Sequence, residues 1–576
     1  MADFDLVIRS GTLIDGTGDD PRDADVAIQG GVIAAVGTVP GRGERELDAG
    51  GAIVTPGFVD VHTHYDGQAV WDDRLQPSSW HGVTTVVAGN CGVGFAPVLA
   101  EHRDSLIQLM EGVEDIPGTA LHEGLSWEWA SFAEYLDVLG RRPRDIDLAT
   151  QVPHAPLRFY AMGERAAAME PATEAEMSAM ARLAREAVEA GALGFTTSRT
   201  LAHKSVSGQL TPTYGSAHRE LGKIAAAIGR AGTGVLQLIT DYDDVDDDFA
   251  LMRELVKISK RPLSVSLFQK RDDPGQYRKV LAELTAANEA GLTIRAQVAP
   301  RCMGIMQGLQ CAVHPFMMNP VWRTLAHLPV AEQARRMAEP SMRAAILAAQ
   351  TDETDPNIAG GMRALRYDTM YLLGATPDYE PDPDATFLDL ASRTGRAPED
   401  IAYDALIADE GRGLIYQPFS NYAWGDLGAV REMLTHEHTI PGLGDGGAHV
   451  GSICDASFPT TLLQLWGRDR ATGRLELPYL VRRQARDTAE AVGLHDRGQL
   501  RAGFKADINV IDMTRLRLHS PRMAHDLPTG GRRLLQRADG YRHTIVSGVE
   551  TYRDGAPTGA LPGRVVRGAQ PRPAAH

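Results

Sequence analysis

The sequence PGFVDVHTHYDG at residues 56–67 follows the apolar run AIVT and predicts a buried strand that runs into a loop. His62 and His64 lie two residues apart, and two such side chains on an extended strand point to the same side. Both imidazoles can therefore bind one divalent cation. For an isolated His-x-His pair, the alternative is two half-buried polar residues at a strand end.

Beyond this strand, short β patterns alternate with helical patterns such as TEAEMSAMARLAREAVEA at residues 173–190. This alternation is typical of parallel strands joined by helices. At this length it predicts an α/β protein with a (β/α)8, TIM-like barrel. The expected strands after the first are residues 84–92, 146–154, 192–199, 234–240, 262–269, 292–301 and 439–449.

Both ends of the chain carry short β patterns broken by glycine turns, at residues 1–54 and 495–560. We expect these two segments to form one small β-sandwich domain, with the barrel at residues 55–494 between them. The long gap before the last strand predicts an insertion near residues 302–435 that helps to cover the barrel mouth. Residues 561–576 predict a loose C-terminal tail.

Composition excludes several classes of protein. A net charge of −17 over 576 residues, without any basic run, argues against a nucleic-acid surface. Four cysteines are too few for a disulfide framework, which favours a reducing cytoplasm. The chain shows neither a basic leader nor an apolar stretch long enough to span a bilayer, so we expect no export and no membrane insertion.

Reactive side chains gather at the expected carboxyl ends of the strands, where barrel enzymes place their active sites. They are His62, His64, Cys91, His154, Asp445 and His449. Each has a structural alternative when taken alone: a cysteine as a small buried residue, a histidine satisfied in the core, or an aspartate that caps a turn. Their coincidence at the ends of several strands favours a site.

Four segments together resemble the D-aminoacylase-like branch of the amidohydrolase superfamily, the N-acyl-D-amino-acid deacylases. They are PGFVDVHTHYDGQ, HGVTTVVAGNCGVGFAP, GLGDGGAHVG and the closing GQLRAGFKADINVID with TIVSGVETYRDG. The resemblance implies a barrel with a β-sandwich domain built from both termini. It also implies His62, His64 and Cys91 as metal ligands, and Asp445 as a metal-bound carboxylate that acts as the general base. Zinc would activate a water for attack on an amide.

The chain departs from this family at the ends of the fifth and sixth strands, where the resemblance implies two further histidines. Ile239 and either Leu267 or Phe268 stand there instead. His203 and His218, in and after the loop that follows strand four, could reach inward, with a surface role as the alternative. We therefore predict one metal per chain, Zn²⁺, with another divalent metal as the alternative.

Other polar residues at strand ends are candidates for binding the substrate. Arg199 and Arg301 could grip a carboxylate bidentately, although each could instead neutralise a nearby aspartate. Gln269, His154 and His449 complete the predicted substrate-binding set.

The predicted function is metal-dependent hydrolysis of a C–N (amide) bond in an N-acyl amino acid or a related small molecule. One alternative keeps the fold and the metal but acts on a cyclic amide, a lactone or another substrate. A second alternative is a catalytically inactive relative. We expect a small-molecule substrate and no nucleic-acid or membrane partner, and the sequence leaves a homo-oligomer open.

Overall fold

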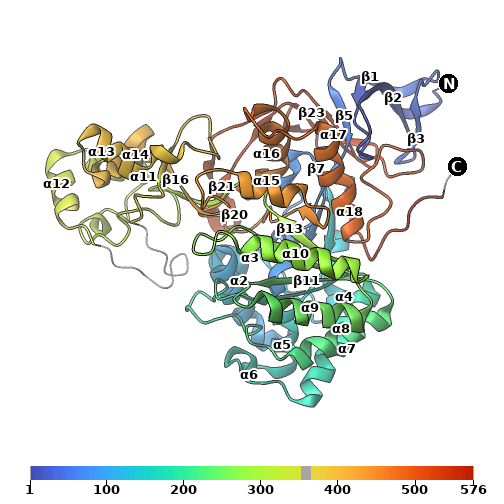
Figure 1. Ribbon diagram of the computed structural model, residues 1–576, viewed down its shortest axis with the longest axis horizontal. Coiled ribbons are helices and arrows are strands. Elements are labelled where there is room, and N and C mark those ends of the chain that lie inside the picture. The colour runs from blue at the N-terminus through green and yellow to red at the C-terminus, as the bar shows by residue number, and fades with distance from the viewer. Residues whose placement is uncertain (1, 352–364, 575–576) are drawn as a thin grey trace.

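The computed structural model describes residues 2–351 and 365–574 (Figure 1). Its centre contains two parallel sheets. The first is formed by β6 (Phe58–Asp60), β7 (Val83–Ala88) and β8 (Asp147–Thr150). The second has six strands, in the spatial order β17 (Thr439–Pro441), β13 (Ile294–Val298), β12 (Leu263–Leu267), β11 (Val235–Thr240), β10 (Gly194–Arg199) and β9 (Val152–Pro153).

The two sheets adjoin one another at both of their ends. Gln151 alone separates β8 from β9. At the other junction, an isolated parallel bridge joins Thr63, just after β6, to Gly446, just after β17. All these strands fall within or overlap the ranges expected from the sequence, and all of them pair in parallel, as expected for an α/β protein.

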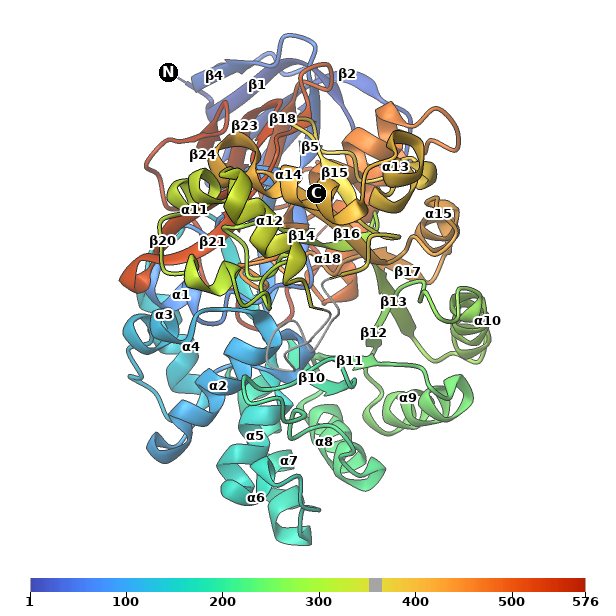
Figure 2. The ribbon, with the colours of Figure 1, turned by 90° about the vertical axis from the view of Figure 1, so that its left-hand side faces the viewer.

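Helices lie along the outer side of the larger sheet (Figure 2). They are α5 (His154–Met162), α7 (Glu174–Ala190), α8 (His218–Ala231), α9 (Val245–Ser259) and α10 (Gln276–Glu289). In α7, the sequence determines where the helix begins and ends. Thr173 and Glu176 form a reciprocal capping box at its start, and Gly191, with a φ of 124°, ends it. Its buried face includes Met177, Met180 and Ala184.

Shorter helices fill the connections on either side. Between β6 and β10 lie α1 (Gln68–Trp71), α2 (Arg103–Glu114), α3 (Gly118–Gly124), α4 (Phe132–Arg141) and α6 (Glu164–Ala167). After β17 come α16 (Phe458–Thr461), α17 (Leu477–Arg482) and α18 (Thr488–Ala491). In the part of the chain that the structure describes, no helix has the length and apolar character needed to cross a membrane.

A nine-stranded sheet combines the two ends of the chain. β18 (Ile508–Ile511) pairs antiparallel with β5 (Ile53–Pro56), and this contact joins the N-terminal and C-terminal segments. The N-terminal strands are β1 (Phe4–Leu13), β2 (Arg22–Gln29), β3 (Val32–Gly37), β4 (Gly43–Asp48) and β5 (Ile53–Pro56). The C-terminal strands are β18 (Ile508–Ile511), β23 (Tyr541–Val546), β24 (Val549–Arg553) and β25 (Ala556–Pro557). Buried residues from both ends, such as Ile8 and Val510, share one apolar cluster.

Two small antiparallel strand pairs precede β23 in the C-terminal segment, one enclosing the other in the sequence. β19 (Arg517–Leu518) pairs with β22 (Ala538–Asp539), and β20 (Arg522–Leu527) pairs with β21 (Gly531–Leu535).

The segment between β13 and β17 has a core of its own, which includes Phe316, Phe387 and Tyr403. It contains an antiparallel sheet of β14 (Met303–Gln307), β16 (Leu414–Ser420) and β15 (Tyr371–Leu373). Its helices are α11 (Val330–Met337), α12 (Pro340–Ala348), α13 (Phe387–Thr394) and α14 (Pro398–Gly411). Figure 1 shows these helices projecting to one side of the molecule.

The insertion was expected near residues 302–435, but in the structure it ends before α15 (Gly428–Thr435). Residues 352–364 of this range lie outside the described residues. The last helix of that range, α15, packs against β13 and β17. It therefore belongs with the parallel strands and not with the projecting segment.

The C-terminal residues also differ from the loose tail expected at residues 561–576. Val566 N donates to Leu148 O at 2.8 Å, and Leu148 N donates to Arg564 O at 3.0 Å. Gln570 N donates to Gly493 O at 2.9 Å. Backbone hydrogen bonds to β8 and to the segment after α18 therefore hold residues 564–570, a pairing that composition does not reveal.

Candidate metal centre

His62 and His64 follow β6 and face the same site. Thr63 between them donates to Val87 O on β7 through both its amide and its hydroxyl, at 3.1 and 2.9 Å. The loop after β17 pairs with the same segment, since Asp445 N donates to His62 O at 3.0 Å and His64 N donates to Gly446 O at 2.8 Å. These backbone contacts bring the predicted first and eighth strand ends together.

Cys91 sits in a tight turn immediately after β7. Its backbone has a φ of 56°, in the left-handed region that residues other than glycine rarely adopt. Side chains of neighbouring strands hold the turn: Cys91 N donates to Gln237 Oε1 at 3.2 Å, and Gly92 N donates to Thr196 Oγ1 at 3.0 Å. A Cβ on Gly92 would lie 2.9 Å from the Cα of Thr197, so only glycine fits next to the cysteine.

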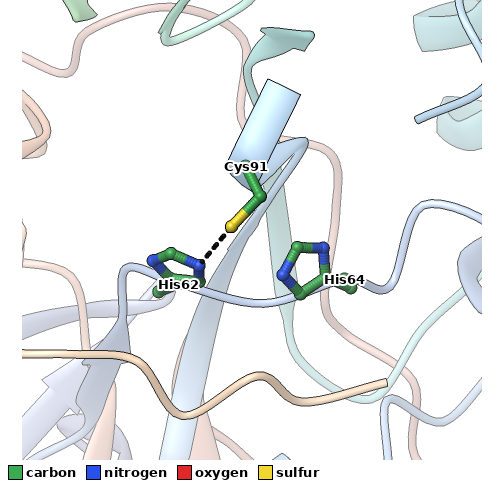
Figure 3. Close-up of side chains that lie close together, drawn as sticks. All are labelled: His62, His64 and Cys91. Atoms are coloured by element: carbon green, nitrogen blue, oxygen red, sulfur yellow. Dashed lines mark hydrogen bonds between the residues drawn. The ribbon is translucent and has the colours of Figure 1, made fainter. Parts of the chain in front are cut away.

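The ligand atoms of His62, His64 and Cys91 all lie within 4.8 Å of one another (Figure 3). His62 Nε2 is 3.2 Å from Cys91 Sγ. Asp445 Oδ1 faces both imidazoles, at 3.4 Å from His62 Nε2 and 3.6 Å from His64 Nε2. Two imidazoles, a thiol and a carboxylate form a donor set that fits a divalent transition metal, zinc above all.

Burial sets the protonation of this cluster. It raises the pKa of the Cys91 thiol to about 12 and lowers the pKa of His62 to about 4. Burial also opposes ionisation of Asp445, but the hydrogen bond and the charge of His64 hold the pKa of Asp445 below the usual range. A neutral His62 offers a lone pair, whereas Cys91 becomes a thiolate ligand only when a cation replaces its proton.

Two residues outside the predicted set orient the imidazoles. Gln297 Oε1 lies 2.6 Å from His62 Nδ1, and Gln297 Nε2 donates to Ser264 Oγ at 3.0 Å. Glu114 lies between His64 and His449, with Oε1 3.3 Å from His64 Nδ1 and Oε2 3.6 Å from His449 Nε2. Histidines that bind metals commonly place the second ring nitrogen against such a carbonyl or carboxylate.

One feature of the sequence could have identified Glu114 as a residue of the site. It is fully buried and continues the apolar face of α2, four residues after Met110. A carboxylate on the buried face of an amphipathic helix needs a partner.

His203 faces inward from the loop after β10. Its Nδ1 lies 2.9 Å from Ser198 Oγ, and Ser198 shares one side of β10 with Thr196, which contacts the cysteine turn. Burial and the charges of His449 and His64 lower the pKa of His203 to about 3. Of the two orientations that the sequence left open, the structure therefore has the inward one.

Comparisons with known proteins agree with this arrangement. The sequence pattern of the amidohydrolase family matches residues 45–552. The chain belongs to the amidohydrolase family. It is 28% identical over 574 residues to D-aminoacylase of Alcaligenes xylosoxydans xylosoxydans, covering 98% of this chain and 97% of that protein. N-acyl-D-glutamate deacylase of the same organism is 33% identical over 304 residues, 52% of this chain and 57% of the relative.

Solved structures show the same α/β fold. The amidohydrolase chain matches a crystal structure of D-aminoacylase with a TM-score of 0.65 and 24% identity, over 98% of this chain and 100% of the other. N-acyl-D-glutamate deacylase from Bordetella bronchiseptica, complexed with zinc and a phosphonate inhibitor, matches with a TM-score of 0.64 and 24% identity, over 98% and 99%. The resemblance to the D-aminoacylase-like branch is thus confirmed.

Two predicted substrate residues lie outside the metal cluster of this amidohydrolase. His154 begins α5, and its ring nitrogens contact Thr197 Oγ1 and Glu220 Oε1, each at 2.8 Å. Thr197 points away from the side of β10 that carries Ser198, so His154 lies between β10 and α8. Arg199 also lies on that outer side, where it donates to Ser216 O at 2.8 Å.

Arg301 and Gln269 are also held by protein groups. Arg301 is fully buried, donates to Asp455 Oδ1 at 2.9 Å and stacks 3.4 Å from the ring centre of Tyr379. This is the ion pair that the sequence left as the alternative. Gln269 Oε1 accepts from Ala423 N at 3.0 Å and so ties the loop after β12 to the end of the projecting segment. Of the predicted substrate set, His449 alone contacts the cluster, through Glu114.

Proposed function

We propose that this amidohydrolase hydrolyses the amide bond of an N-acyl amino acid, with a divalent metal held by His62, His64, Cys91 and Asp445. The observation that carries the proposal is the convergence of the imidazole and thiol donors within 4.8 Å. Family membership supports the class of reaction, and the similarity to D-aminoacylase and N-acyl-D-glutamate deacylase supports the N-acyl amino acid.

The architecture supports the same proposal. We infer that β6 to β13 and β17 form one (β/α)8 barrel, and that the nine-stranded sheet belongs to a small β-sandwich domain made from both ends of the chain. The metal cluster then lies at the carboxyl ends of the strands, which is where barrel enzymes carry out their chemistry.

Asp445 is the proposed general base. A divalent cation held by this cluster would supply the Lewis acidity that makes water a nucleophile at neutral pH. Asp445 accepts the proton of the attacking water and delivers it to the departing nitrogen as the C–N bond breaks and the new C–O bond forms. Its place 3.4 Å from His62 Nε2 and 3.6 Å from His64 Nε2 suits a carboxylate that works next to the cation.

The other residues of the cluster keep the donors in place. Gln297 Oε1 accepts the Nδ1 proton of His62, which leaves Nε2 free to bind a cation. Glu114 Oε1 lies 3.3 Å from His64 Nδ1, where its charge favours a proton on Nδ1 and so leaves Nε2 for a cation. We propose one zinc ion per chain because Ile239 and Leu267 stand at the ends of β11 and β12, where further imidazoles would be needed for a second ion. The metal centre of D-aminoacylase is described as binuclear, with activation by one metal and attenuation by the second, so a count of one ion would separate this chain from that relative.

The test combines metal analysis with a substrate screen. Wild-type protein should contain about one zinc per chain and hydrolyse members of a panel of N-acyl-D- and N-acyl-L-amino acids, with cyclic amides and lactones included. Cys91→Ala should lose both metal and activity, whereas Cys311→Ala, which removes another buried thiol outside the cluster, should keep both. Metal-loaded protein that hydrolyses only the cyclic amides or lactones would exclude the proposed substrate.

A further inference from the structure

We infer that a pocket outside the metal cluster binds a free α-amino acid whose side chain is apolar or aromatic. The pocket lies between the loop after β12 and the segment that projects between β13 and β17, and its volume is about 160 Å³. A cavity of about 150 Å³ holds a benzene molecule, so the side chain of an amino acid fits this space. The described residues that line the pocket include none of the proposed metal ligands.

Hydrogen bonds hold both sides of this pocket. Gln269 N donates to Asn421 Oδ1 at 2.7 Å, and Asn421 N donates to Gln269 O at 3.0 Å. Ala423 N donates to Gln269 Oε1 at 3.0 Å, so the loop after β12 is tied to the end of the projecting segment at three points. On the far side, Phe387 N donates to Met370 O at 2.9 Å and holds the start of α13 against the residue before β15. The pocket is therefore part of the folded junction between the two segments.

Two side chains of opposite charge line the pocket. Arg271 Nη2 donates to Asp368 Oδ2 at 3.2 Å, and both side chains are 45% exposed. An exposed ion pair of this kind contributes little to stability, so a ligand can replace it. Among the described residues that line the pocket, these two alone are charged. A ligand that carries one positive and one negative group therefore satisfies both.

Both members of this ion pair have atoms left for a ligand. Asp368 contacts Arg271 and Arg366 through Oδ2 alone in the described part of the chain, so Oδ1 can accept from an ammonium group. Arg271 gives one of its five N–H groups to Asp368, and the others can donate to a carboxylate. An α-amino acid carries its ammonium and its carboxylate on one carbon. This arrangement suits two opposite charges that lie side by side.

The rest of the pocket wall is mainly aromatic and apolar. Tyr371 and Tyr422 meet edge to face, with their ring centres 6.4 Å apart, and Tyr422 OH donates to Pro381 O. Phe419 and Pro383 line the same pocket, and Phe419 is 36% exposed. An apolar side chain that covers these rings is removed from water and covers an exposed ring as well. The wall therefore favours an amino acid with an apolar or aromatic side chain.

A buried hydroxyl in the pocket has no partner. Ser420 is only 5% exposed and lines the pocket, yet its Oγ makes no hydrogen bond with any described residue. Buried polar groups nearly always have a hydrogen-bond partner. The carboxylate of a bound amino acid can accept the hydrogen of Ser420. This unpaired hydroxyl points to a ligand independently of the two charges.

The inference does not depend on the proposed function, because the pocket and the metal cluster share no residue among those described. The proposed reaction releases a free amino acid, so the pocket would bind the class of molecule that the metal centre produces. One sheet joins the two places. β16, which ends at Ser420, pairs with β14, and Met306 N in β14 donates to Ser452 O at 2.7 Å, three residues after His449.

The test measures binding of leucine and phenylalanine, each as the D and the L enantiomer, to zinc-loaded wild type by isothermal titration calorimetry. At least one of these amino acids should bind. Phenylalaninamide, which lacks the carboxylate, and 3-phenylpropionate, which lacks the ammonium group, should each bind at least about 10-fold more weakly than phenylalanine. Absence of binding by all four amino acids overturns the inference, and so does equal affinity for phenylalanine and both analogues.

Four variants place the binding site. Arg271→Met and Asp368→Asn should each weaken binding of the amino acid about 10- to 100-fold, the usual range for a lost charge-assisted hydrogen bond. Arg141→Met is the matched control, because it breaks the still more exposed ion pair with Glu128 outside the pocket. Cys91→Ala, which removes a proposed metal ligand, should keep the binding. Binding that is lost in Cys91→Ala and kept in Arg271→Met would locate the amino acid at the metal centre and overturn the inference.

The same variants separate binding from structure. If the Arg271–Asp368 pair serves only to hold the projecting segment, both variants should lower the midpoint of thermal unfolding and leave the affinity unchanged, which overturns the inference. If neither variant folds, Ser420→Ala decides: it should weaken binding about 10-fold, and unchanged affinity overturns the inference. Hydrolysis of N-acyl amino acids plays no part in these measurements, so a failed substrate screen would leave this inference standing.

Discussion

Replacement of Asp445 by asparagine should lower kcat by about 10²- to 10⁴-fold, the range typical of a lost general base. This corresponds to about 3–5 kcal/mol of transition-state stabilisation. The substitution removes the base and little else, because asparagine has the size and shape of aspartate. It keeps one oxygen where Asp445 Oδ1 lies, 3.4 Å from His62 Nε2 and 3.6 Å from His64 Nε2. The amide oxygen still contacts a cation, but it cannot take up a proton at neutral pH.

The assay measures kcat at saturating zinc, so that weaker metal binding does not enter the comparison. Metal content and the midpoint of thermal unfolding should stay close to the wild-type values. Asp115→Asn is the control, since Asp115 is a nearby buried carboxylate that accepts from Ser452 Oγ at 3.0 Å and is not a member of the cluster. Wild-type kcat in fully loaded Asp445→Asn would refute the assignment of the base.

Three further substitutions test the surroundings. His64→Ala should abolish metal binding and activity while the protein stays folded by circular dichroism; retained metal would refute its role as a ligand. Glu114→Gln should weaken zinc affinity about 10- to 100-fold in a chelator competition, because it loosens His64; unchanged affinity would exclude this role. Asp147→Asn should cost about 3–5 kcal/mol in urea unfolding, because it leaves Arg497 and Lys505 buried without their shared carboxylate. As a control, Glu128→Gln breaks the exposed ion pair with Arg141 and should lower the free energy of unfolding by less than about 1 kcal/mol. Equal losses of stability in the two variants would contradict the reasoning.

The periodicity of the sequence was sufficient to locate the parallel strands, and with them the strand ends where the candidate residues lie. Strand spacing identifies where each strand ends, and a short motif such as His-x-His fixes two side chains on one side of a strand. Cys91 and Asp445 followed from the resemblance, and the structure brings both to the histidines.

The substrate residues were harder to predict because strand ends alone do not say which way a side chain points. Arg199 directly follows Ser198 in β10, so the two side chains point to opposite faces and Arg199 faces the helices instead of the site. His154 belongs to the first turn of α5 and not to the strand before it. Arg301 pairs with Asp455, more than 150 positions later in the chain. Glu114 likewise reaches the site through His449, more than 300 positions later. Such contacts depend on tertiary packing and leave little trace in local patterns.

Anomalous-difference diffraction from zinc-replete crystals, recorded at the zinc edge, tests the proposed metal centre most directly. One peak is expected per chain, within bonding distance of His62 Nε2, His64 Nε2, Cys91 Sγ and a carboxylate oxygen of Asp445. A peak at any other place, two peaks of full occupancy, or the absence of a peak between these residues would contradict the proposal.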